Sequence, residues 1–201
     1  MPFTARSITL SALVLLLLAA CGSSPKVHYF SLSPMDSGYK QDSEDAAVLG
    51  FGPLRMPEYL NRSQIVTRGA GAELQVDEFN RWAEPLSLSL HRIASTDVDK
   101  LLDDVIVIAF PYESVIRTQV DYRLVGDVNR FDADRSGRVV LEVQWAVADM
   151  DAGLAVPATR GRYEAQAAVA DDPGAIAVAM NRALNMFSRE IASKLEAALQ
   201  E

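Results

Sequence analysis

The sequence predicts an α+β domain, in which a largely antiparallel sheet packs two main amphipathic helices on one face. Three observations predict this class. Apolar and polar residues alternate in several short runs, apolar residues recur at helical spacing in two longer segments, and Gly, Pro and Asp cluster between them. Runs of strands with so few helices favour α+β over alternating strand and helix units.

The first 20 residues predict a lipoprotein signal peptide. Arg6 precedes an apolar run that ends at Ala20, which is shorter than the roughly 20 residues a membrane-spanning helix needs. The run closes with Leu18-Ala19-Ala20-Cys21, which resembles a lipobox. Cys21 is therefore the predicted lipidation site, and several acyl chains such as palmitate would hold it stably. The alternative is an ordinary signal peptide with Cys21 uninvolved.

This interpretation divides the chain into a signal peptide (1–20), a lipidated tether (21–26) and a single periplasmic domain (27–201). Gly22 and Ser23 follow the cysteine, where Asp would favour retention in the inner membrane. We therefore expect a lipid-anchored protein on the periplasmic face of the outer membrane. Roughly 180 residues are enough for one core.

The composition argues against two kinds of partner. Removal of residues 1–20 takes away only one charged side chain, Arg6, so the net charge changes from −8 to −9. An acidic chain is poorly suited to nucleic acid, or to anionic lipid through a basic patch. Cys21 is the only cysteine, so no disulfide is expected within the chain.

The first half predicts four short strands and one helix. Alternating or apolar residues predict strands over 26–33, 47–54, 63–68 and 73–79, with a loop over 34–45 and a glycine-rich hairpin connection over 69–72. Pro53 and Pro57 are expected to end the second strand, since proline has no backbone donor. Pro85 begins a helix that ends near Asp104.

That helix presents Leu86, Leu90, Ile93 and Leu101 on one face, with Asp97 mostly elsewhere. The run 105–110 (VIVIAF) is continuously apolar, which is typical of a strand in the middle of a sheet.

Three longer runs, 119–131, 138–149 and 159–169, predict an antiparallel meander with connections at 132–137 and 150–157. Asp172 and Pro173 predict a capped start for a C-terminal helix. Its apolar face is predicted to comprise Ile176, Met180, Ala183, Leu184, Phe187, Ile191, Leu195 and Leu199.

Few residues suggest catalysis, a cofactor or a metal site. His28 and His91 lack ligand-spaced partners, and no Gly-x-Ser-x-Gly sequence is present. Gly50-Phe51-Gly52-Pro53 is better explained as a strand end than as a dinucleotide loop. The segment 132–137 begins like a calcium loop, but position twelve is Val143. A polar hairpin turn is favoured there, and we expect no enzyme activity, cofactor or metal.

Arg81 and Trp82 lie just before the first helix. Trp82 is best explained as a structural corner beneath the helix. The alternative is a contact surface for a partner or a second subunit, because aromatic residues and arginine dominate interface energies.

Several segments resemble the ABC-type transport auxiliary lipoproteins of the PqiC (YmbA) type. The lipobox is followed by 27–32 (VHYFSL), then by 57–66 (PEYLNRSQIV) and 81–86 (RWAEPL), while 129–131 and the meander fit more loosely. The resemblance covers most of the chain after Cys21, and is most specific in its first half. Tyr59, Arg81 and Trp82 lie in these segments and are candidate interface residues.

The resemblance implies a non-enzymatic subunit of an intermembrane lipid transport system. Its partners would be an MCE-domain protein that forms a conduit, and ABC-type or other inner-membrane transport subunits. Homo-oligomeric rings are expected from proteins of this type. Two mechanisms stay open: a tethered ring that docks the conduit at the outer membrane, or an apolar groove that binds phospholipid directly. An anchored envelope hydrolase and an unrelated structural lipoprotein are weaker alternatives.

Overall fold

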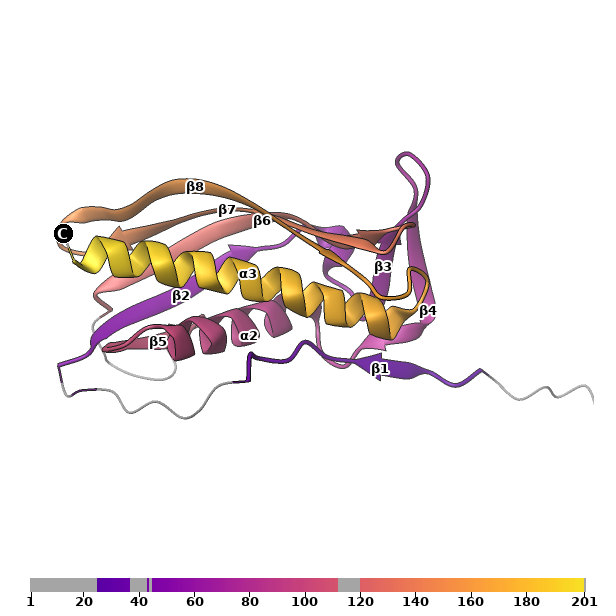
Figure 1. Cartoon of the computed structure of the whole chain (residues 1–201), viewed down its shortest axis with the longest axis horizontal. Helices are drawn as coiled ribbons and strands as arrows, with labels where there is room; N and C mark the ends of the chain where they lie inside the picture. Colours follow the sequence, from indigo (N-terminus) through magenta and orange to yellow (C-terminus); the bar gives the residue numbers. More distant parts are fainter. Residues whose placement is uncertain (1–24, 37–42, 44, 112–119, 201) are drawn as a thin grey trace, which may run out of the picture.

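The computed structural model describes residues 25–36, 43, 45–111 and 120–200. The predicted signal peptide, Cys21 and most of the predicted 34–45 loop lie outside these residues. The described chain forms an eight-stranded sheet with helices α2 and α3 on one face (Figure 1). This arrangement confirms the predicted α+β class.

The strands and helices follow one another along the chain in nearly the predicted order. They are β1 (His28–Phe30), β2 (Ala47–Arg55), η1 (Glu58–Leu60), β3 (Gln64–Arg68), β4 (Leu74–Trp82), α2 (Leu86–Leu101), β5 (Val105–Ala109), β6 (Tyr122–Asp134), β7 (Arg138–Asp149), β8 (Gly153–Gln166) and α3 (Pro173–Leu199). Neither α2 nor α3 is long and apolar enough to cross a membrane.

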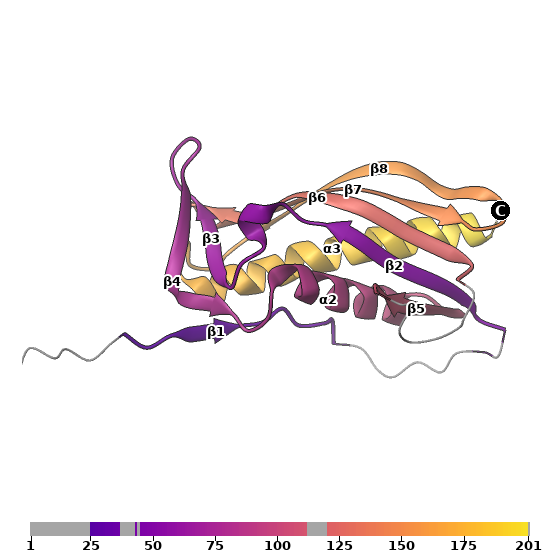
Figure 2. The ribbon, with the colours of Figure 1, turned by 180° about the vertical axis from the view of Figure 1, so that it is seen from behind.

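The long strand β6 organises the sheet. On one side it pairs with β7, which pairs with β8, and these two antiparallel ladders are the longest in the molecule. On the other side its first half lies parallel to β2 and its last residues lie parallel to β3. The strands β3, β4 and β1 therefore extend one end of the sheet, as Figure 2 shows from behind.

The helices bury the faces that the sequence predicts. Leu86, Leu90 and Ile93 of α2 are at most 1% exposed, and the α3 stripe from Ile176 to Leu195 is buried. Leu199 is an exception at 38% exposure, because it lies at the very end of α3. The start of α3 is capped as predicted, since the side chain of Asp172 accepts a hydrogen bond from the Ala175 N–H at 2.6 Å.

The predicted position of the run 105–110 is wrong. β5 lies at the end of the strand order, beside β2, and Ile106 is 37% exposed. The helix α2 covers β5 on one face, so one apolar face of the strand is buried and the other is not. The β-branched run therefore predicts a strand correctly, but it does not predict a position in the middle of the sheet.

Two proline positions also differ from the prediction. β2 continues past Pro53 to Arg55, because a register shift between Phe51 and Leu54 places the proline where no ladder donor is needed. β8 begins at Gly153, so Pro157 lies inside a strand rather than in a loop. β8 is an outer strand that pairs with β7, with a register shift near this proline. The meander itself is confirmed, and β6 extends to Asp134.

Candidate docking surface

The predicted interface residues have different environments. Trp82 is 3% exposed and packs in the core, which agrees with a structural corner. The side chain of Arg81 is 33% exposed, and its Nε donates to the Glu78 carbonyl oxygen at 3.0 Å. Tyr59 is partly buried. Cys21 lies outside the described residues. A partner-binding role for the three described residues stays a prediction.

The phenol of Tyr59 belongs to a polar cluster that we name the Asp132 cluster. Its members are Tyr59 of η1, Arg68 of β3, and Arg130 and Asp132 of β6. The Asp132 carboxylate is fully buried and accepts hydrogen bonds from Tyr59 Oη at 2.9 Å, Arg68 Nε at 2.9 Å and Arg130 Nε at 2.8 Å. Burial, together with the neighbouring Asp132 carboxylate, raises the pKa of Tyr59 to about 12. The phenol therefore stays protonated and serves as a donor.

The sequence does not predict this cluster, although Arg130 lies in the 129–131 segment of the family resemblance. In the sequence, Asp132 stands out only as the first residue of a calcium-like turn. The signal available was weak, because Arg68 and Asp132 are 64 residues apart and meet only through the β3–β6 pairing. With Asp132 engaged by two guanidinium groups, the cluster is a structural junction of η1, β3 and β6.

The segment 132–137 contains the favoured hairpin turn, but the turn is shorter than expected: residues 132–134 end β6 and residues 135–137 connect it to β7. The Asp134 carboxylate accepts from the Ser136 N–H at 2.8 Å and from Arg138 Nε at 3.1 Å. Gly137 has φ +75°, a backbone conformation that favours glycine. Among the described residues, no group of three or more His, Cys, Asp or Glu side chains is arranged to hold a metal ion.

His91 has both ring nitrogens engaged with backbone groups. Its Nε2 accepts the Leu54 N–H at 2.8 Å, and its Nδ1 lies 2.7 Å from the Ser87 carbonyl oxygen, to which it donates. Burial lowers the pKa of this imidazole, so it is neutral at pH 7. The register shift in β2 leaves the Leu54 N–H without a partner in the ladder, and His91 accepts its hydrogen bond instead. Both ring nitrogens are therefore occupied, and neither is available for proton transfer.

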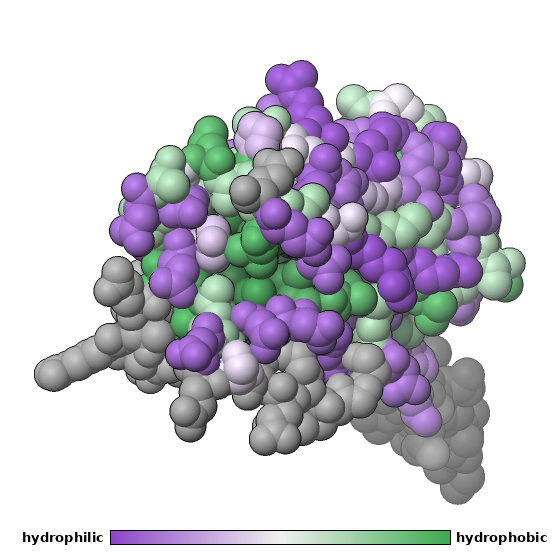
Figure 3. Space-filling view, turned by 60° about the vertical axis from the view of Figure 1, so that its left-hand side comes forward, coloured by the Kyte–Doolittle hydropathy of each residue, from purple (hydrophilic) through white to green (hydrophobic). Residues whose placement is uncertain are grey.

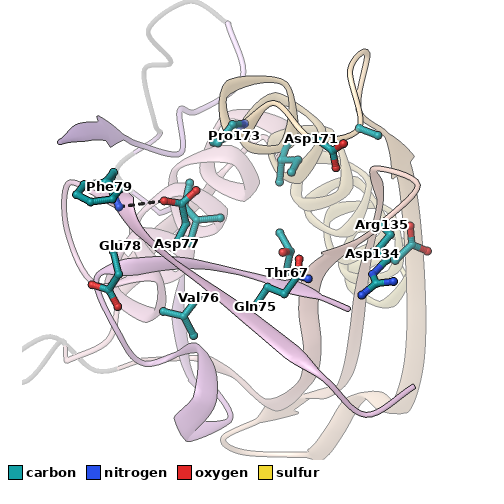
Figure 4. Close-up of a pocket in the computed structure, with 13 residues that line it drawn as sticks. Thr67, Gln75, Val76, Asp77, Glu78, Phe79, Asp134, Arg135, Asp171 and Pro173 are labelled. Atoms are coloured by element: carbon teal, nitrogen blue, oxygen red, sulfur yellow. Dashed lines mark hydrogen bonds between the residues drawn. The ribbon is translucent and has the colours of Figure 1, made fainter. Parts of the chain in front are cut away.

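A cavity of about 500 Å³ lies between the β3–β4 hairpin, the β6–β7 turn and the start of α3 (Figure 4). Ile65 and Ile176 contribute apolar wall, while Asp77, Asp134 and Asp171 bring carboxylates to it. Although burial opposes the shift, hydrogen bonds from Asn80 and from the backbone lower the pKa of Asp77. Asp77 is therefore ionised at neutral pH and brings negative charge to the cavity.

The one arginine of this cavity, Arg135, is already paired. Its Nη2 lies 3.1 Å from a carboxylate oxygen of Glu73. An anionic group that entered the cavity would meet several carboxylates and one neutralised cation.

Residues 31–36, which we name the strap, cross from β1 onto both helices. Leu32 is 2% exposed. The Ser33 N–H donates to Asn181 Oδ1 at 2.9 Å, the Met35 N–H donates to Asp97 Oδ1 at 2.7 Å, and Lys100 Nζ donates to the Met35 carbonyl oxygen at 2.9 Å. The strap thereby fixes the start of the domain to α2 and α3.

The position of Asp97 corrects the sequence prediction. It was expected mostly away from the apolar face of α2, yet it is fully buried. The side-chain amide of Asn185 points its nitrogen toward the Asp97 carboxylate and donates to Asp97 Oδ2 at 3.1 Å. Burial raises the pKa of Asp97. The residue is buried because the strap and α3 both supply it with donors.

Comparison with known proteins assigns the fold to a family of lipoproteins. The sequence profile described as "ABC-type transport auxiliary lipoprotein component" matches residues 30–192. Among curated proteins, none matches the chain in sequence.

The fold recurs in several solved structures. Protein XCC0632 from Xanthomonas campestris is 17% identical with a TM-score of 0.67, covering 86% of this chain and 97% of its own. The crystal structure of an uncharacterised protein is 17% identical with a TM-score of 0.69, covering 85% and 99%. The hypothetical protein CT253 from Chlamydia trachomatis is 8% identical with a TM-score of 0.51, covering 76% and 99%.

Proposed function

Because the chain belongs to the ABC-type transport auxiliary lipoprotein family, we propose that it is a lipid-anchored accessory subunit of an MCE/ABC-type intermembrane lipid transport system. In this proposal it docks the transport conduit at the outer membrane, on the periplasmic side. The observation that carries the proposal is the family match, which spans residues 30–192 and so includes most of the described chain. The family is defined as a transport component rather than as an enzyme.

The anchor supports this role in two ways. Cys21 ends a lipobox-like sequence, and Gly22 and Ser23 after it are compatible with the outer membrane. Only four residues separate Cys21 from Lys26, so the domain stays close to the membrane. A docking platform needs such a position, whereas a protein that crosses the periplasm alone would need a longer reach.

Direct phospholipid binding is the second mechanism, and the charge of the cavity argues against it. A phosphate group in the cavity would face the carboxylates of Asp77 and Asp171, and that of Asp134, which is already paired with Arg138. Like charges at close range repel, most strongly where water is partly excluded. The cavity is thus better matched to a cationic or neutral group than to a phospholipid head group, and the docking role is favoured.

The end of the molecule opposite β1 is the proposed meeting point with the conduit. We name it the far end; it consists of the β7–β8 turn and the last residues of α3 (Figure 1). Its exposed apolar side chains include Met150, Leu154 and Leu199, which are 47%, 66% and 38% exposed. Figure 3 turns this side forward and shows apolar surface bordered by polar residues.

Copurification from membranes tests the proposed function. The native protein, extracted in mild detergent, should bring down an MCE-domain protein, and the Cys21→Ser variant should lose both membrane retention and transport function while keeping its fold. Recovery of the native protein without any MCE-domain or transporter subunit would contradict the proposal. Full function of the Cys21→Ser variant would show that the anchor is dispensable.

Self-association into a ring is proposed from the resemblance to the PqiC type and has a separate test. A version that begins after Cys21 should show an oligomeric native mass, and a clean monomer at high concentration would refute the ring. Arg81→Glu tests the predicted interface, with the exposed Arg160→Glu on β8 as a charge-matched control. Loss of the oligomer in Arg81→Glu alone would locate the interface between subunits near β4.

A further inference from the structure

Three exposed apolar side chains gather where β1 joins β4. Val27 is 39% exposed, Tyr29 is 66% exposed and Phe79 is 45% exposed. β1 and β4 are parallel, with His28 opposite Asn80. Val27 and Phe79 each precede this pair, so they are neighbours at the start of the ladder. We name these three residues the anchor-end patch.

The length of the tether limits how far this patch can lie from the membrane. Pro25 is the first described residue, four positions after Cys21. A chain spans at most about 3.6 Å per residue, so the two Cα atoms are no more than about 14 Å apart whatever path the tether takes. Val27 is only two residues further along the chain. The membrane surface that holds the lipidated cysteine therefore lies within a few residue lengths of the patch.

The chemistry of the patch suits the interfacial region of a bilayer. Tyr29 combines an apolar ring with a hydroxyl group, and such amphipathic rings are favoured at the depth of the lipid head groups. Val27 and Phe79 would bury apolar surface that is otherwise exposed to water.

The charges around the patch do not favour anionic lipid. Lys26 and Arg81 supply positive charge, but Glu78 pairs with Arg81 at 3.7 Å. Asp77 belongs to the same strand as Phe79. Asp171 and Asp172 lie just before α3. They are close to β1, because Gly174 at the start of α3 faces the ring of Phe30. Because carboxylates near the patch are at least as numerous as cations, the contact between the anchor-end patch and the membrane would rest on apolar and aromatic groups. It should form with zwitterionic lipid and should resist salt.

We propose that Val27, Tyr29 and Phe79 rest in the head-group region of the bilayer that holds the Cys21 anchor. This inference rests on the proposed lipid anchor and adds an orientation to it. The far end, with the β7–β8 turn and the end of α3, lies at the opposite end of the molecule (Figures 1 and 2). It therefore points into the periplasm, where a conduit would arrive.

Depth-dependent quenching tests the orientation on the full lipidated protein. The protein is reconstituted into phosphatidylcholine vesicles that contain a lipid with a head-group-region quencher. A dye is attached at Glu78→Cys, beside the patch, or at Asp151→Cys in the β7–β8 turn. Glu78 has a side chain that is 62% exposed, and Asp151 is also exposed. We expect strong quenching at position 78, unchanged by added salt, and none at position 151.

Side-chain variants then identify the groups responsible. In the Glu78→Cys background, the double substitution Tyr29→Ser and Phe79→Ser should remove the quenching. Leu154→Ser, which removes an equally exposed apolar side chain at the far end, should leave it unchanged. Equal quenching at the two labelled positions, or no effect of the double substitution, would overturn the proposed contact.

The design separates failure of the contact from failure of the anchor. Protein that stays on the vesicles without quenching at position 78 would refute the contact alone and leave the proposed function standing. Protein that leaves the vesicles after a wash would refute the lipid anchor, and this inference with it.

Discussion

The buried carboxylate of Asp97 holds the strap against both helices, and its replacement should distinguish the role of its oxygen from that of its charge. In Asp97→Asn, an amide oxygen can still accept the Met35 N–H that now donates to Oδ1 at 2.7 Å. In Asp97→Ala that donor is left without its acceptor, which costs about 1–3 kcal/mol. We expect the alanine variant to lose about 2 kcal/mol of unfolding free energy, and the asparagine variant to match or exceed the wild type at pH 7.

The stability difference between wild type and Asp97→Asn should depend on pH, and its direction follows from the pKa of Asp97. Burial raises the pKa of Asp97 above the ordinary value of 3.8, so the unfolded chain releases this proton at a lower pH than the native protein does. Between the two pKa values the unfolded state binds fewer protons, and stability falls as the pH rises. The asparagine variant has no such proton, so its advantage over the wild type should grow with pH through that window.

Urea unfolding followed by tryptophan fluorescence, repeated from about pH 4 to pH 7, measures both effects. The free energy of unfolding should fall in Asp97→Ala at every pH. If Asp97→Asn were as unstable as Asp97→Ala throughout, the reasoning would be wrong. Attraction between the ionised carboxylate and nearby Lys100 and Arg189 would then outweigh its burial cost.

Four further substitutions test the Asp132 cluster, the core and the α3 cap. Asp132→Asn should cost about 2–3 kcal/mol, because it weakens charge-assisted hydrogen bonds such as that from Arg68, whereas Tyr59→Phe should cost about 1 kcal/mol; equal urea midpoints for the two would contradict this ranking. Phe187→Ala removes a fully buried ring and should cost about 3–5 kcal/mol, which a thermal scan would show as a Tm lower by roughly 10 °C. Asp172→Ala removes the α3 cap and should cost about 1 kcal/mol in the same urea assay.

The predictable part of this fold is the part encoded locally. The stripe from Ile176 to Leu195 repeats with the period of a helix, and Asp172 and Pro173 mark its start, so α3 follows from neighbours in sequence. The β3–β4 hairpin and the β6–β7–β8 meander likewise follow from alternation and turn residues. Such patterns identify strands that are joined by short connections.

The unpredicted part depends on pairing between distant segments. The apolar sequence of β5 predicts a buried central strand. Its position is instead decided by the parallel pairing with β2, which lies nearly 60 residues earlier in the chain. Asp97 and Asp132 look like surface residues until the strap, α3 and β3 bring donors to them. Hydrophobic periodicity cannot show these pairings, because a buried carboxylate looks like any exposed one in sequence.

The strap also connects the anchor to the rest of the molecule. β1 joins β4 through three residue pairs, from His28 to Phe30, and so short a strand is held only weakly. The orientation of the domain on the membrane must therefore depend on the strap as well. Asp97→Ala should leave the lipidated protein on vesicles while it lowers the quenching at position 78, because the freed Met35 segment lets the domain tilt. Unchanged quenching in this variant would show that β1 alone transmits the position of the anchor.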